Sequence, residues 1–341
     1  MWPPGSNGWP RHDRSLRVSE RGHTVTLEPL LWGVVYLQRV MKVGVCVPAQ
    51  TRISCPELRE LSAPPTLRDL SPGYRLARWD TPSALAPPCR DRLHRTLCEL
   101  AERTFSADHS SYWRARMEAG FFDQITTLAL ILGPDGSPVG WGGHHRRRFA
   151  GRRALYLDAT GILPTHRRFG LSAALMIHFL TREVFTHPLL PTYVVMRTRH
   201  PAVYNGWREG FGSGRVFPDE LRKTPALVRR IAGEVAEWLG DGPGLDPQTL
   251  VVSDAYRMFD GDVYGVPLSS GRPHIDAYFE NNVGAKDAVL VVARLSAPVL
   301  AAAVAARAAR ERVRHRPWLG GRPPRAGRSA RVALGSSELF Q

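Results

Sequence analysis

The residues with the clearest chemical potential lie between a predicted strand and a predicted helix. The apolar run 155–163 predicts a strand that Pro164 ends. The run 171–185 predicts a helix that is apolar on two sides and therefore largely buried. The turn between them holds two arginines, a glycine and a small residue, in the order Arg167, Arg168, Phe169, Gly170, Leu171 and Ser172. Because the first amides of a helix lack internal partners and the helix dipole favours negative charge there, this turn is suited to a phosphate group.

A second strand and helix follow further along the chain. The run 193–198 predicts a strand, and the next segment predicts a helix that ends near residues 210–211. Together the two segments resemble the GNAT superfamily of acyl-CoA-dependent N-acyltransferases. For the family's Val-x-Pro and Arg/Gln-x-x-Gly-x-Gly/Ala motifs, this chain has Ile162-Leu163-Pro164 and Arg167 to Ser172. For the family's Thr-x-Asn-Pro, helical Tyr and Gly-Phe, it has Thr198-Arg199-His200-Pro201, Tyr204 and Gly210-Phe211.

Three features of these segments depart from the family pattern. Ser172 stands where the family has Gly or Ala, which exchanges one small residue for another. His200 stands where the family has Asn. Tyr204 lies in a helix that is about one residue shorter than the family pattern, which changes the register of that side chain.

The resemblance implies an α+β fold: a mixed, mostly antiparallel twisted sheet, flanked by helices and splayed at its two central strands, with a C-terminal insertion. It also implies acetyl-CoA as co-substrate. The pyrophosphate would bind the amides of residues 168–172, and the pantetheine would lie beside the strand that ends at Leu163. A backbone amide near Gly161 or Ile162 would polarise the thioester carbonyl. His200 would belong to the same cofactor site.

Direct transfer to an amine needs a base for the amine and a proton for the leaving thiolate. Asp158 lies in the first strand and is the candidate base, acting through a water molecule. If this carboxyl is buried in its apolar run, we expect its pKa to be raised. The alternative is a hydrogen-bonding role at the strand end. The resemblance implies that Tyr204 is the acid that protonates the thiolate, and it requires no cysteine.

The composition bounds the class of protein. The formal charge is +15 at pH 7, and all but three of the 46 basic residues are arginines in a chain rich in Gly and Pro. Translated GC-rich DNA tends to have this composition, so the charge alone does not require an acidic partner. The four cysteines form no Cys-x-x-Cys pair, and we expect reduced thiols in a cytoplasmic protein. The sequence contains no run of 18 apolar residues, so no membrane span is expected.

Three regions are predicted: an irregular N-terminal extension over 1–72, a GNAT-like domain over 73–296 and a basic, partly disordered tail over 297–341. Within the domain, we expect a hairpin over 125–148, a strand over 249–257, a loop over 260–282 and a last strand over 287–295. Four aromatic residues are candidates for an acceptor pocket or for core packing: Tyr112, Trp113, Phe121 and Phe122. His144 and His145 are adjacent on a strand and face opposite sides, so no metal site is expected.

The function that these observations favour is an N-acetyltransferase that moves an acetyl group from acetyl-CoA to a primary amine. A small molecule is favoured over a protein as the acceptor, although an antibiotic amine, a protein N-terminus and a lysine all stay open. Two alternatives remain: a GNAT-fold module that binds acyl-CoA without transfer, and nucleic-acid binding through the arginine-rich tail, which we consider less favoured. The acyl group and the oligomeric state are not determined by the sequence.

Overall fold

The computed structural model describes residues 64–219, 222–265 and 267–314. The sheet and its helices belong to a compact unit that ends at Ala303, and the chain from Val304 onward forms a second unit. Most of the predicted N-terminal extension and of the basic tail lies outside the described residues. The hypothesis that the tail binds nucleic acid therefore concerns residues that the structure does not describe. Among the described residues, no helix is both long and apolar enough to cross a membrane.

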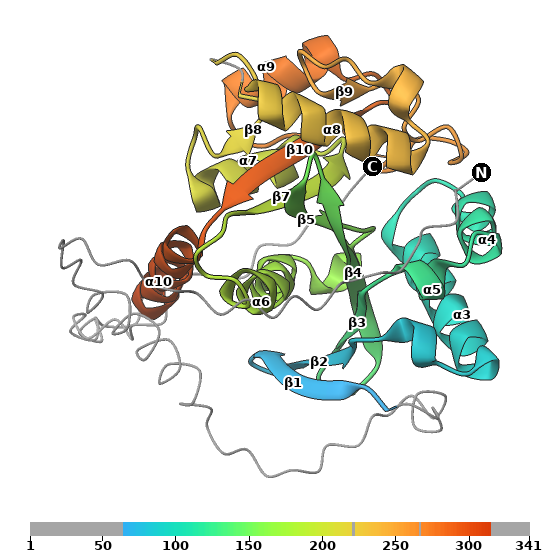
Figure 1. Cartoon of the computed structure of the whole chain (residues 1–341). Helices are drawn as coiled ribbons and strands as arrows, with labels where there is room; N and C mark the ends of the chain where they lie inside the picture. The colour runs from blue at the N-terminus through green and yellow to red at the C-terminus, as the bar shows by residue number, and fades with distance from the viewer. Residues whose placement is uncertain (1–63, 220–221, 266, 315–341) are drawn as a thin grey trace, which may run out of the picture. The chain divides into compact units, whose positions relative to one another are not determined.

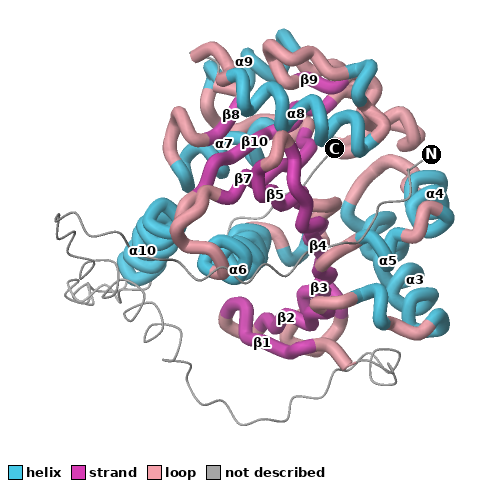
Figure 2. The backbone as a smooth tube through the Cα atoms, in the orientation of Figure 1, coloured by secondary structure: helices cyan, strands magenta, loops and turns pink. Residues whose placement is uncertain are grey.

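Ten strands of the described chain form one sheet, in the order β1-β2-β3-β4-β5-β7-β10-β8, with β6 paired to β4 and β9 paired to β10. Figure 2 shows the strands as a continuous magenta path from β1 to β8. The strands span Thr66–Ser71 (β1), Tyr74–Trp79 (β2), Thr127–Leu132 (β3), Pro138–Phe149 (β4), Arg152–Leu157 (β5), Gly161–Ile162 (β6), Thr192–Thr198 (β7), Val216–Phe217 (β8), Val251–Val252 (β9) and Ala288–Leu295 (β10).

Helices flank this sheet (Figure 1). The α-helices span Pro87–Thr104 (α3), Ser110–Glu118 (α4), Phe121–Gln124 (α5), Leu171–Phe185 (α6), Pro201–Phe211 (α7), Ala226–Leu239 (α8), Pro273–Asn282 (α9) and Ala297–Arg314 (α10). Short 3-10 helices span Pro82–Ala84 (η1), Pro164–His166 (η2) and Gly242–Gly244 (η3). The predicted boundaries of α6 are confirmed, because its apolar periodicity begins directly after a glycine with φ of +71°.

The two central helices cover opposite faces of β4. His144 contacts Phe179 of α6, with ring centroids 5.0 Å apart, whereas His145 contacts Trp238 of α8 at 5.1 Å. Since successive side chains of a strand face opposite sides, α6 and α8 must lie on different faces. The two histidines thus face opposite sides of β4, as the sequence predicts.

The centre of the sheet is splayed. Strands β5 and β7 pair in parallel only at Ala154↔Tyr193, Leu155↔Val194 and Tyr156↔Val195. After Tyr156 the chain parts from β7 but stays beside β4, and β6 pairs with β4 with Ile162 opposite Gly140. Strand β7 continues to Thr198 and pairs there with β10 alone. The expected fold class, a mixed and mostly antiparallel sheet flanked by helices and splayed at its centre, is confirmed.

Four expectations about individual elements were wrong in detail. The strand predicted over 155–163 is broken at residues 158–160, because one extra residue bulges out of the pairing with β4. Strand β1 lies inside the predicted irregular extension and pairs with β2. Only Val251–Val252 of the predicted strand 249–257 is a strand. The predicted loop 260–282 includes helix α9, which Pro273 begins.

Candidate active site

The turn between β6 and α6 exposes the start of a 15-residue helix. The first bond within α6 runs from the amide of Ala174 to the carbonyl of Gly170, at 3.0 Å. The amides of Leu171, Ser172 and Ala173 therefore have no partner within the helix. Ser172 is exposed, so an anion has access to these amides from solvent.

The two arginines of this turn take different roles. Arg167 donates to the carbonyls of Ile162, at 3.2 Å, and Thr104, at 2.8 Å, so its guanidinium ties the turn to α3. Arg168 is exposed and adopts a φ of +70°, next to Gly170 with its own positive φ. Phe169 is 58% exposed and packs against Tyr74, with the two rings tilted at 42° and their centroids 5.7 Å apart.

Strand β6 directs one backbone amide into the splay. The Leu163 amide donates to the carbonyl of Val139 on β4, at 2.9 Å. Because successive peptide groups of a strand point to opposite edges, the amide of Ile162 points away from β4. Gly161 packs against Trp141, so closely that a Cβ atom there would lie 2.2 Å from the indole. Of the two amides expected to polarise a thioester, Ile162 is the one with the suitable direction.

His200 caps the start of α7. Its Nδ1 accepts a hydrogen bond from the Ala202 amide, at 3.2 Å, as the N-cap side chain. Burial lowers the pKa of His200, which favours the neutral ring that such an acceptor needs. His200 thus supplies the cap that an asparagine would otherwise provide, and its ring lies 5.2 Å from that of Tyr264.

Asp158 follows β5 directly and is held by Arg116 and His145. Arg116 of α4 donates Nη1 to Asp158 Oδ1 at 2.6 Å and Nη2 to Oδ2, and His145 Nε2 lies 2.7 Å from Oδ2. Burial alone would raise the pKa of Asp158, but Arg116 and His145 outweigh it and hold that pKa far below its ordinary value. The expectation of a raised pKa was therefore wrong, because it took no account of ion-pair partners distant in sequence. A carboxylate this acidic is a weak base.

His145 lies between two hydrogen-bonding partners. Its Nδ1 lies 3.0 Å from the carbonyl of Gln124, and its Nε2 lies 2.7 Å from Asp158 Oδ2. These two contacts fix the orientation of the ring beside Asp158. Among the described residues, no group of three or more His, Cys, Asp and Glu side chains is placed to hold a metal ion.

Asp158 opens into a cavity of about 690 Å³ on the α8 side of the sheet. Aromatic side chains form much of its wall: Tyr112, Phe121, Tyr156, Trp238 and Phe259. Burial raises the pKa of both Tyr112 and Tyr156, so their hydroxyls stay protonated near neutral pH. Two of the aromatic residues proposed for a pocket, Tyr112 and Phe121, do line this one.

The cavity also holds a second charged cluster, which the sequence analysis missed. Arg197 of β7 pairs with Asp241, and Arg257 pairs with the same carboxylate at 2.9 Å. Arg197 gave a usable signal, because it is the charged residue of the otherwise apolar strand β7. Arg116 gave no such signal, since arginine is common on the exposed surface of helices.

Tyr204 lies elsewhere. Its ring is almost fully buried, and its hydroxyl donates to the carbonyl of Pro218 at 2.6 Å. Tyr278 and Phe279 of α9 pack against it. Tyr204 is not among the residues that line the cavity at Asp158, so the structure does not bring the two proposed catalytic side chains together.

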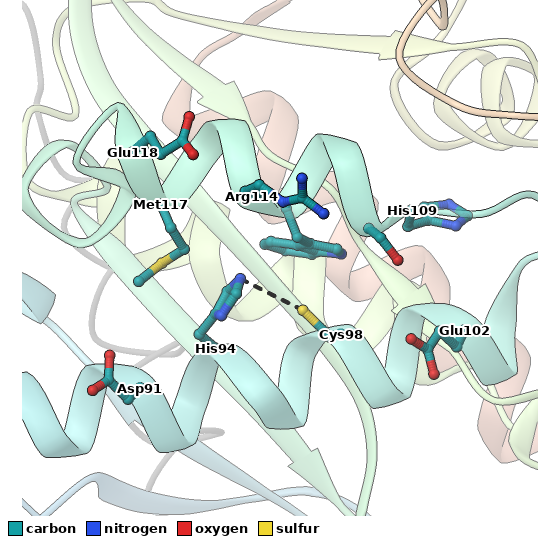
Figure 3. Close-up of a pocket in the computed structure, with 10 residues that line it drawn as sticks. Asp91, His94, Cys98, Glu102, His109, Arg114, Met117 and Glu118 are labelled. Atoms are coloured by element: carbon teal, nitrogen blue, oxygen red, sulfur yellow. Dashed lines mark hydrogen bonds between the residues drawn. The ribbon is translucent and has the colours of Figure 1, made fainter.

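A second cavity, of about 470 Å³, lies between α3 and α4 (Figure 3). In it, Cys98 Sγ lies 3.5 Å from His94 Nε2, one helical turn away on α3. Burial raises the pKa of the Cys98 thiol to about 11, so the thiol stays protonated at neutral pH. This pair is therefore poorly suited to nucleophilic chemistry.

Comparison with known proteins finds similarity at the level of structure. No protein-family model matches the sequence, and no curated protein matches it. A GNAT family N-acetyltransferase of Escherichia coli in complex with CoA aligns over 33% of this chain and 61% of its own, with 17% identity and a TM-score of 0.28. A GNAT family acetyltransferase of Brucella melitensis in complex with acetyl-CoA aligns over 35% and 74%, with 12% identity and a TM-score of 0.26.

A third solved structure covers more of the chain. Naa50 of Arabidopsis thaliana, in complex with the bisubstrate analogue CoA-Ac-MVNAL, aligns over 64% of this chain and 97% of its own, with 14% identity and a TM-score of 0.32. The two bacterial structures carry the name of the family that the sequence motifs resemble. Similarity at these TM-scores is partial, and an argument about function has to come from the geometry of the site.

Proposed function

We propose that this protein is an acyltransferase of the GNAT type, which moves an acetyl group from acetyl-CoA directly to a primary amine. The observation that carries the proposal is the splay at the centre of the sheet. Strands β5 and β7 part after three parallel residue pairs, and the chain then runs through β6 to the exposed start of α6. This arrangement would let a cofactor lie between the parted strands, with its phosphates against a helix N-terminus.

The residues beside the parted strands fit the parts of acetyl-CoA. The amides of Leu171, Ser172 and Ala173 would bind the pyrophosphate, with the exposed Arg168 adding positive charge. The pantetheine would run along β6 beside Leu163. The amide of Ile162 points away from β4 and would donate to the thioester carbonyl as negative charge develops on its oxygen.

The acceptor would enter from the cavity at Asp158, on the opposite face of the sheet from α6. Its three arginines, Arg116, Arg197 and Arg257, disfavour an ammonium ion and so lower the pKa of a bound amine. The amine then attacks the thioester carbon as a neutral nucleophile, the carbon–sulfur bond breaks, and the thiolate takes the proton that the nitrogen loses. In this proposal Asp158 positions Arg116 and His145 and is not the base.

Titration calorimetry with acetyl-CoA tests the cofactor site. In Ser172→Asp, a carboxylate beside the bound pyrophosphate is expected to weaken binding about tenfold or more, while it favours the helix itself. Ser172→Asn is the matched control, because it has nearly the same shape without the charge, and it should bind within about threefold of the wild type. Equal affinity for the two variants would place the cofactor elsewhere, and a wild-type protein that does not bind acetyl-CoA would remove the proposal.

One observation favours a second candidate, an acyl-CoA-binding module without transfer. Asp158 is locked by its ion pairs and Tyr204 by its bond to a main-chain carbonyl, so neither is poised for proton transfer. Release of free CoA thiol in the presence of a panel of amines separates the two candidates. A protein that binds acetyl-CoA and releases no thiol with any amine would be the module.

A further inference from the structure

The cavity at Asp158 contains more positive than negative charge. Its two buried carboxylates are bound by three arginines: Asp158 by Arg116, and Asp241 by Arg197 and Arg257. Three guanidinium groups therefore surround two carboxylates. Glu118 also lines the cavity, but its side chain is exposed, where water and salt screen its charge.

Two of these arginines retain hydrogen-bond donors. Within the part of the chain that the structure describes, the bonds of Arg197 to Asp241 and to the Ala255 carbonyl both use Nη1. The bonds of Arg257 to Asp241 and to the Asp254 carbonyl also both use Nη1. The Nη2 and Nε donors of each guanidinium remain, and this pair of donors matches the two oxygens of a carboxylate.

The two arginines, Arg197 and Arg257, differ in how far their side chains are exposed to solvent. The Arg197 side chain is 16% exposed and sits deep on β7, whereas that of Arg257 is 51% exposed and lies at the cavity mouth. Arg147 adds positive charge beside the lining residue Trp238, with its guanidinium 4.9 Å from the centroid of that ring. An anionic group that enters the cavity thus meets positive charge from the rim inward.

The walls between the charges are aromatic. Tyr156 and Trp238 pack edge to face on the α8 side, with centroids 5.2 Å apart. Tyr112 and Phe259, which also line the cavity, pack with centroids 4.8 Å apart. Aromatic walls suit a planar, apolar body, and a cavity of about 690 Å³ is large enough for a small aromatic molecule.

We infer that the acceptor is a small aromatic amine that also carries a carboxylate, of the aromatic amino acid class. Its carboxylate binds Arg257 and Arg197, its ring lies between the aromatic walls, and its amino group is directed to the end of β5. This inference rests on the proposed function, because it assigns the acceptor of that same reaction. It disfavours polyamines and lysine side chains, whose second cation would meet the surplus of positive charge.

Ligand pairs that differ only in the carboxylate test this inference without acetyl-CoA. L-Phenylalanine and phenethylamine, and L-tryptophan and tryptamine, are titrated into the full-length protein by calorimetry. A charge-assisted, bidentate contact predicts that each amino acid binds about tenfold or more tighter than its decarboxylated partner. Arg257→Gln is expected to reduce that ratio at least about fivefold, because Asp241 keeps Arg197 and the site stays folded.

The matched control is Arg272→Gln, an equally exposed arginine that pairs with Glu209 outside the cavity and should leave the ratio unchanged. Equal or tighter binding of the decarboxylated amines, or no binding of either amino acid, overturns the inference. The acetyl-CoA titration is independent of these measurements. A protein that binds acetyl-CoA and acetylates phenethylamine in preference to phenylalanine would keep the proposed function and lose this acceptor.

Discussion

Removing Arg116 should destabilise the protein and make its stability depend on pH in a defined direction. Arg116 and Asp158 form a buried bidentate pair, and the guanidinium also lies over three aromatic rings, with that of Phe121 at 4.4 Å. Breaking one side of such a pair leaves an uncompensated buried charge and costs about 3–5 kcal/mol. For a domain of this size, that loss corresponds to roughly 6–20 °C in Tm.

The sign of the pH effect follows from the pKa of Asp158. In the wild type this pKa is lowered, so the pair's contribution is fully present above the unfolded-state value of about 3.9 and is lost as the pH falls through the folded-state value. In Arg116→Leu, burial remains and the main opposing charge is gone, so the pKa of Asp158 rises. The stability gap between wild type and variant should therefore be smaller at pH 5 than at pH 8.

Urea unfolding followed by tryptophan fluorescence measures this gap at both pH values. Arg272→Leu is the control, because its pair with Glu209 is 58% and 50% exposed and should contribute about 0–1 kcal/mol. Adding Asp158→Asn to Arg116→Leu removes the stranded charge and should recover part of the loss. A loss below about 1 kcal/mol, or a double variant no more stable than the single one, would refute this account of the pair.

Two further predictions concern packing and the role of Tyr204. Gly161→Ala should lower the free energy of unfolding in urea by about 1–3 kcal/mol, because its Cβ would collide with Trp141. Gly206→Ala lies in a helix with open space around it and should raise that free energy by about 0.5–1 kcal/mol. Equal effects of the two substitutions would contradict this packing. Tyr204→Phe should lower the free energy of unfolding by about 1–3 kcal/mol, because it leaves the buried Pro218 carbonyl without its hydrogen-bond donor. The same substitution should change kcat for acetyl transfer less than about threefold. A hundredfold fall in kcat would instead indicate that Tyr204 is the acid.

Local signals in the sequence determined the elements that form the proposed cofactor site. The start of α6 and the strand β7 follow from apolar periodicity and from a glycine at a helix boundary, which act over a few neighbouring residues. The central splay was expected from resemblance alone. By contrast, α9 has a weak apolar pattern, and the chain before it is dominated by Gly and Pro, so the sequence indicated a loop.

Only the tertiary structure decided the chemistry of the Asp158 cavity. The same carboxyl in an apolar run has a raised pKa when isolated and a lowered one beside Arg116, which lies 42 residues away in sequence. Likewise, Arg197 and Asp241 are 44 residues apart and meet only because the chain after α8 returns to β7. Electrostatic energy depends on distance in space and on burial, and neither quantity is encoded in the spacing of residues along the chain.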